Sequence, residues 1–164
     1  MNQRGHILIE TVMAATMLII VAAIILPKTF YIYRTAQIEQ EAATLVADLR
    51  NLQSQSRSSD FRAAGLNDFY APSSVMTMYV NKSGWQIRHS VSEIYYRHNL
   101  PAALSIETFR SPAKVVVNFG QNGGSVQNNT FKIYAADNPS LCRYVIISGM
   151  GRIRTSTTPP AGEY

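Results

Sequence analysis

Two arginines near the carboxyl end carry the clearest chemical signal in this sequence. They lie in the run Gly149-Met150-Gly151-Arg152-Ile153-Arg154, two positions apart. On a β-strand Arg152 and Arg154 would point to one face while Ile153 points to the other. Two guanidiniums on one face can each contact a phosphate of a nucleic-acid backbone, which gives salt-dependent binding without sequence readout. The alternative is an ordinary solvated arginine pair on an edge strand, where charge deters aggregation.

A single carboxylate, Glu10, marks the other end of the chain. It lies near the start of an apolar run, residues 6–26, that follows the short polar leader MNQRG. The portion 7–26 has about the 20 residues that a helix needs to cross a hydrocarbon core. An ionised side chain at mid-bilayer costs roughly 2.5–3.5 kcal/mol, so a carboxylate in such a run calls for a partner. One alternative places Glu10 in the headgroup region of the membrane.

Two common explanations of the apolar run account for less of it. A secretory signal peptide would be followed by an A-x-A-like cleavage pattern. Instead Pro27 follows, and then come Phe30, Tyr31 and Tyr33, aromatic residues that suit a membrane interface. A plain transmembrane anchor explains everything except Glu10.

The leader and the apolar run resemble the class III signal of type IV prepilins and type II secretion pseudopilins. That signal is a short basic leader ending in glycine, then the future N-terminal residue, then a glutamate four residues later. Here the corresponding residues are Arg4, Gly5, His6 and Glu10. The resemblance implies that a prepilin peptidase cuts between Gly5 and His6 on the cytoplasmic side and methylates the amine of His6. The family usually has phenylalanine where His6 stands, but cleavage depends mainly on the glycine.

Filament assembly gives Glu10 the partner that it needs. In a helical filament its carboxylate can pair with the freed amine of His6 on a neighbouring subunit. The pair would offset two desolvated charges and fix the register between subunits. We therefore expect other pilin or pseudopilin subunits, the prepilin peptidase and inner-membrane lipid as partners.

The remaining pattern predicts an α+β fold with the organisation of a type IV pilin. Residues 1–5 form the leader, 6–27 a transmembrane or filament-core helix, and 28–57 its amphipathic continuation, with Pro27 as a possible kink. Within 28–57 apolar residues recur at steps of three and four, which predicts a stripe packed on a sheet. The stripe consists of Ile38, Ala42, Leu45, Leu49 and Leu52.

Residues 58–156 read as a β-rich head on an antiparallel sheet, and 157–164 as a flexible tail. We predict eight strands, at 75–80, 85–89, 93–97, 104–108, 114–119, 130–135, 143–148 and 152–155. A turn is predicted at Asp137-Asn138-Pro139. Trp85, Tyr95 and Tyr96 read as core or sheet-face residues.

The carboxyl-terminal third sharpens the resemblance. The runs VVVNFGQNGGSV, TFKIYA and CRYVIISGMGRIRT are similar to the end of GspH/FimT-type pseudopilins, and the G-R-x-R finish looks like the DNA-binding motif of FimT-type minor pilins. The resemblance implies that Arg152 and Arg154 bind double-stranded DNA without sequence specificity and that Gly151 shapes the turn. Arg143, Lys132 and Lys114 could widen the patch. The alternative is a GspH-like pseudopilin that serves protein secretion and binds no DNA.

Composition excludes several other functions. The chain has 164 residues and a formal charge of +5, and residues 82–154 hold nine basic against three acidic side chains. A basic surface attracts polyanions or anionic lipid, although many basic domains bind neither. Cys142 is the sole cysteine and reads as a small buried hydrophobe beside a strand, so no intrachain disulfide can form. His89 and His98 do not suggest a metal pair, and no catalytic set is visible. We expect a non-enzyme without cofactor or metal, anchored once in the inner membrane with its head outside the cytoplasm.

Overall fold

The computed structural model describes residues 3–58, 76–88, 94–109, 115–120, 123–125 and 128–160. The predicted tail beyond residue 160, His89 and Lys114 lie outside these ranges. The chain divides into two compact units, Met1–Ala36 and Gln37–Tyr164, and we call the second the head unit.

One helix, α1 (Gln3–Ser58), runs through the whole amino-terminal third of the chain. Between residues 6 and 57 the sequence contains no glycine and a single proline, Pro27, so little opposes a continuous helix. Pro27 lies inside the helix without ending it. The predicted long helix is confirmed.

The amino-terminal unit leaves its apolar side chains exposed. Large apolar residues between Leu8 and Tyr33 are more than half exposed, as Ile24 is at 71%. By length and composition α1 can cross a membrane: its most apolar window, within Leu8–Arg57, has a mean hydropathy of 2.5 and none of it is buried. This surface therefore has no cover from the described part of its own chain.

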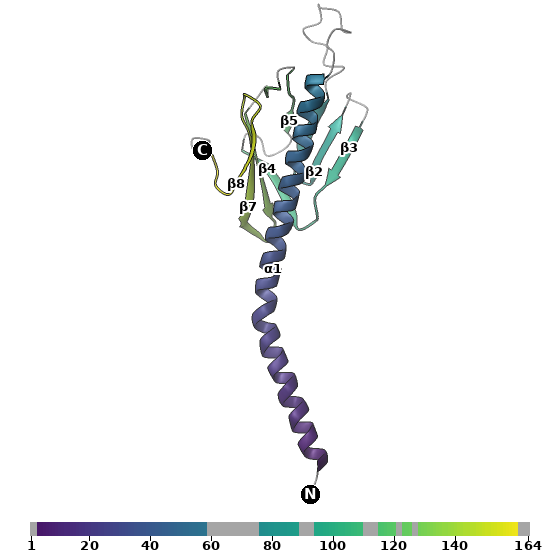
Figure 1. Ribbon diagram of the computed structural model, residues 1–164, viewed down its shortest axis with the longest axis vertical. Helices are drawn as coiled ribbons and strands as arrows, with labels where there is room; N and C mark the ends of the chain where they lie inside the picture. Colours follow the sequence, from purple (N-terminus) through teal and green to yellow (C-terminus); the bar gives the residue numbers. More distant parts are fainter. Residues whose placement is uncertain are drawn as a thin grey trace, which may run out of the picture. The chain divides into compact units, whose positions relative to one another are not determined.

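The head unit contains two antiparallel sheets of four strands each (Figure 1). In the first, the order is β3-β2-β1-β5, with β1 (Thr77–Asn81), β2 (Gly84–Arg88), β3 (Ile94–Asn99) and β5 (Val115–Val117). In the second, the order is β4-β6-β7-β8, with β4 (Leu104–Thr108), β6 (Asn129–Ala135), β7 (Asn138–Ile147) and β8 (Ile153–Ser156). The chain leaves the second sheet once, when β5 pairs with β1.

The eight predicted strands are confirmed, although they form two sheets instead of one. The predicted start of β7 was wrong, because this strand begins at Asn138 and the turn lies at Ala136–Asp137. Pro139 is tolerated because it lies in the irregular stretch between the pairs Ala135–Asn138 and Tyr134–Cys142. A proline there removes no hydrogen bond from a regular ladder.

The predicted stripe of α1 forms the centre of the core. Each of its five residues is at most 2% exposed, and Leu45 and Leu49 are fully buried. They cluster with Trp85 of the first sheet and Phe131 of the second, so the helix packs on both sheets. Burying a leucine side chain contributes roughly 1.5–3 kcal/mol, which makes this stripe a main source of head stability.

Two carboxylates of α1 fasten the helix to the first sheet. The indole Nε1 of Trp85 donates to Asp48 at 2.7 Å, and the His98 ring lies 2.6 Å from a Glu41 oxygen. The Trp85 and His98 rings stack with their centroids 4.3 Å apart. Partial burial, and then the charges of Asp48 and Glu41, raise the pKa of the nearby Tyr96 hydroxyl. Trp85 is a core residue, as predicted.

Candidate functional site

The first three residues of the predicted motif, Gly149-Met150-Gly151, form a hairpin loop between β7 and β8. The Gly151 N–H donates to the Ser148 carbonyl at 2.8 Å, and the Ser148 N–H donates to the Arg152 carbonyl at 3.0 Å. Gly151 has a φ of +79°, the left-handed conformation that this loop type requires at its last position. Glycine adopts it without strain, so Gly151 shapes the loop.

The hairpin is held against the end of α1 by Gln53. The side-chain amide of Gln53 donates to the Gly123 carbonyl at 2.6 Å and to the Gly151 carbonyl at 2.8 Å. Gly151 approaches the Gly123 backbone so closely that a Cβ would overlap the Gly123 carbonyl oxygen. The sequence pattern did not reveal Gln53, because only the fold brings positions 53, 123 and 151 together.

Arg152 and Arg154 extend from this hairpin into solvent. Both side chains are exposed, and within the described residues neither guanidinium makes a hydrogen bond or ion pair. Arg154 is in register with Ile146, whereas the neighbouring Val145 and Ile147 face the core under α1. The Ser148–Arg152 bond extends the ladder by one residue, so Arg152 lies on the same outer face as Arg154. The two charges are available for a ligand.

Lys132 shares the outer face with Arg154, but an acidic residue lies beside it. It is in register with Tyr144 of β7 and with Glu107 of β4. The Tyr134 hydroxyl donates to Glu107 at 2.6 Å, and this hydrogen bond is the main reason that the pKa of Tyr134 is raised. The Lys132 amine lies 5.2 Å from the Tyr134 ring centroid. Glu107 offsets much of the charge that Lys132 could add.

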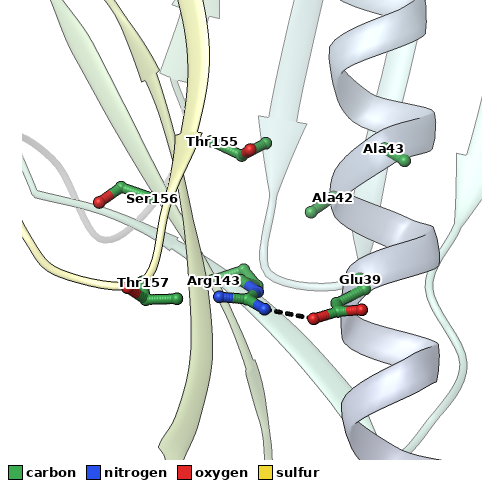
Figure 2. A pocket seen from close by; sticks show the side chains of 7 residues that line it. All are labelled: Glu39, Ala42, Ala43, Arg143, Thr155, Ser156 and Thr157. Atoms are coloured by element: carbon green, nitrogen blue, oxygen red, sulfur yellow. Dashed lines mark hydrogen bonds and ion pairs between the residues drawn. The ribbon is translucent and has the colours of Figure 1, made fainter.

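Arg143 lies on the opposite face of the second sheet, toward α1. Its guanidinium bonds the Glu39 carboxylate, as Figure 2 shows. The pair closes one end of a groove of about 600 Å³ between the helix and β8, which Ala42 and Thr155 also line. The structure therefore does not bring Arg143 together with Arg152 and Arg154.

The amino-terminal candidates are all in α1. Gly5, His6 and Glu10 belong to its first turns, and the Glu10 side chain is exposed in the amino-terminal unit. Cleavage at Gly5 and pairing of Glu10 stay predictions.

The other side chains considered for chemistry are in structural positions. Cys142 lies within β7 and is half-buried, so the prediction of a buried thiol was too strong. His98 contacts Glu41 and Trp85. Among the described residues no three His, Cys, Asp or Glu side chains gather into a group that could hold a metal ion.

Comparison with known proteins identifies the fold. No protein-family model and no curated protein sequence matches the chain. Two crystal structures of the type IV minor pilin FimU from Pseudomonas aeruginosa are similar to it. One, in space group P21, has a TM-score of 0.56 at 19% identity and covers 79% of this chain and 96% of FimU. The other, in space group P65, has a TM-score of 0.53 at 18% identity, with coverage of 77% and 99%. The chain has the fold of a type IV minor pilin.

Gly151→Ala tests whether the hairpin depends on this one backbone conformation. The added Cβ would sit at a positive φ and against the Gly123 carbonyl, so we expect a loss of about 1–3 kcal/mol of head stability, measured by denaturant unfolding. Gly149→Ala is the matched control, because Gly149 is in the same loop without a positive φ. Equal effects of the two substitutions would contradict the assignment.

Proposed function

We propose that this chain is a minor pilin or pseudopilin subunit of a type IV pilus, competence or type II secretion filament. One observation supports the proposal. The described part of the chain leaves an apolar stretch of α1 uncovered, and the same helix continues into the core of a head with the minor-pilin fold. Lipid or the helices of other subunits can cover such a surface. The role is structural, without an enzymatic reaction of its own.

The prepilin pathway accounts for the order of events. The chain inserts once into the inner membrane with its head outside the cytoplasm, and a prepilin peptidase removes residues 1–5. The new amine at His6 then becomes the partner of Glu10 on an adjacent subunit. Because an unpaired carboxylate among apolar helices costs several kcal/mol, the pair favours incorporation in one register.

Glu10→Ala tests the assembly role. In cells that build the filament, we expect the substituted chain to reach the membrane in normal amount. Its amount in the sheared filament fraction should fall about tenfold or more, because the paired carboxylate is absent. Quantitative immunoblotting of both fractions measures the two amounts.

Thr11→Ala is the matched control for this experiment. It removes the neighbouring polar side chain, whose hydroxyl donates to the Leu8 carbonyl of its own helix at 2.9 Å. We expect it to leave incorporation unchanged. Normal incorporation of the Glu10→Ala chain would refute the pairing.

A second function, capture of DNA, is supported by the exposed arginine pair of the β7–β8 hairpin. Arg152 and Arg154 share the outer face of the strand that follows a loop held by Gly151 and Gln53, so the backbone that carries both charges is fixed. Positioned guanidiniums suit phosphate oxygens. The binding would be independent of base sequence, because it involves only the backbone of the nucleic acid.

Substitution of Arg152 and Arg154 by alanine, in one chain, tests DNA capture. Gel-shift titration of the full chain in detergent against duplex DNA should show binding at low salt that weakens as salt rises. The double substitution should weaken binding and reduce the slope of log K against log salt by about two, since each phosphate that an arginine neutralises adds roughly 0.9 to that slope.

A chain with Arg50→Ala and Arg143→Ala removes the same net charge elsewhere, since Arg50 is on α1 and Arg143 faces Glu39. We expect it to bind DNA as the unchanged protein does. An equal decrease in both variants would mean that net charge alone acts. Absence of any shift at low salt would favour a purely structural pseudopilin for secretion.

A further inference from the structure

A second basic site lies on the first sheet, away from the β7–β8 hairpin. It is a polar pocket of about 310 Å³ beside the turn that joins β1 to β2. Its lining residues are Asn81, Ser83, Gly84, Trp85, Gln86, Arg88, Arg97, His98 and Asn99. None of these lining residues is acidic, and two are arginines. A pocket with this lining combines amide and hydroxyl groups with positive charge.

Gly84 makes room for this pocket because it has no side chain. It is the first residue of β2 and is in register with Asn99 of β3. Its φ is +147°, and a Cβ at this position would overlap the His98 carbonyl oxygen. Only glycine fits here, so no side chain rises between Gln86 and the turn. The pocket is therefore a built feature of the strand pair.

Gln86 cannot serve both arginines that flank it. Its carbonyl oxygen reaches Arg97 Nη2 at 3.4 Å in one orientation of the amide. In the other, which fits its neighbours better, the oxygen accepts from Arg88 at 2.9 and 3.3 Å. The hydrogen bond to Arg97 is lost in this orientation, because the NH₂ group takes the place of the oxygen. In that orientation Arg97 has no acceptor among the described residues.

The turn adds further donors. The Asn81 side-chain oxygen accepts from the Ser83 N–H at 3.1 Å and from the Ser83 hydroxyl at 3.0 Å. These bonds occupy the oxygen of the Asn81 amide, and its NH₂ group is a donor. The Asn99 amide lines the pocket from the next strand. Charged and neutral donors thus come from β1, β2 and β3, and no lining residue carries a negative charge to match the two arginines.

We propose that this pocket binds a phosphate group. Guanidiniums form short charge-assisted hydrogen bonds with oxyanions. A phosphate has oxygens on all sides and can accept from donors on three strands, whereas a planar carboxylate has two oxygens. The bound phosphate would give Arg97 the acceptor that Gln86 cannot provide. The site does not depend on Arg152 and Arg154 and goes beyond DNA capture by the hairpin.

The direct test is titration of the isotope-labelled full chain in detergent with inorganic phosphate, followed by NMR at constant ionic strength. We expect saturable shifts of the backbone amides of Gly84, Gln86 and Asn99. Arg97→Gln should weaken binding about tenfold or more, the effect of removing one charged hydrogen bond. Unchanged spectra of the unsubstituted chain at saturating phosphate would overturn the proposal.

Gln86→Glu provides a second and independent readout. A permanent carboxylate between Arg88 and Arg97 should raise the melting temperature of the head and abolish the phosphate response. If Gln86→Glu neither raises the melting temperature nor changes the phosphate response, the proposal that this pocket binds an anion is contradicted.

Two further arms identify the ligand and the site. Acetate should produce clearly weaker shifts than phosphate, and an equal response would replace the phosphate by a carboxylate and refute the proposal as stated. The chain with Arg152→Ala and Arg154→Ala should keep the phosphate response in full. Loss of that response would mean that phosphate binds at the hairpin instead of the pocket. The experiment therefore separates failure of the phosphate pocket from failure of DNA capture.

Discussion

One continuous helix, α1, must be stable in two different environments, and the rest of the structure depends on this. Its amino-terminal portion exposes apolar side chains that nothing in the described chain covers, while the stripe from Ile38 to Leu52 is buried in the head. Apolar surface left in water costs roughly 25 cal/mol for each Å², so cover by lipid or by other helices would stabilise the first portion. The second portion organises two sheets that share it as a common core. A minor-pilin fold is a direct solution to both requirements.

Polar contacts between α1 and the strands fix where the surface sites of the head lie. Asp48 and Glu41 fix the first sheet through Trp85 and His98, and Gln53 fixes the β7–β8 hairpin. Arg152 and Arg154 therefore follow directly on a loop that Gln53 ties to the end of α1. Partly buried polar side chains between the helix and the strands position these sites, because each forms a directional hydrogen bond, which apolar packing does not.

Much of this fold could be predicted from local patterns. Periodicities of 3.6 and 2 residues located the helix, its buried stripe and the strands, because burial of one face imposes those repeats. Patterns could not show that β5 leaves for the first sheet, or that Arg143 faces α1, since both depend on strand pairing between distant segments. Asp48 and Glu41 lie outside the apolar stripe of the helix, and only the fold brings Trp85 and His98 beside them. Gln53 and the Gly84 pocket carried no motif at all.

We propose that the apolar helix is an assembly element matured by the prepilin pathway, and the first residue of the mature chain can show whether this is so. Mass spectrometry of the chain recovered from membranes and sheared filaments of cells with an active prepilin peptidase would identify the first residue. The account predicts that the mature chain begins at His6 and that cells without the peptidase retain the leader MNQRG. An N-terminus beyond Leu26, or an intact leader in cells with the peptidase, would contradict it.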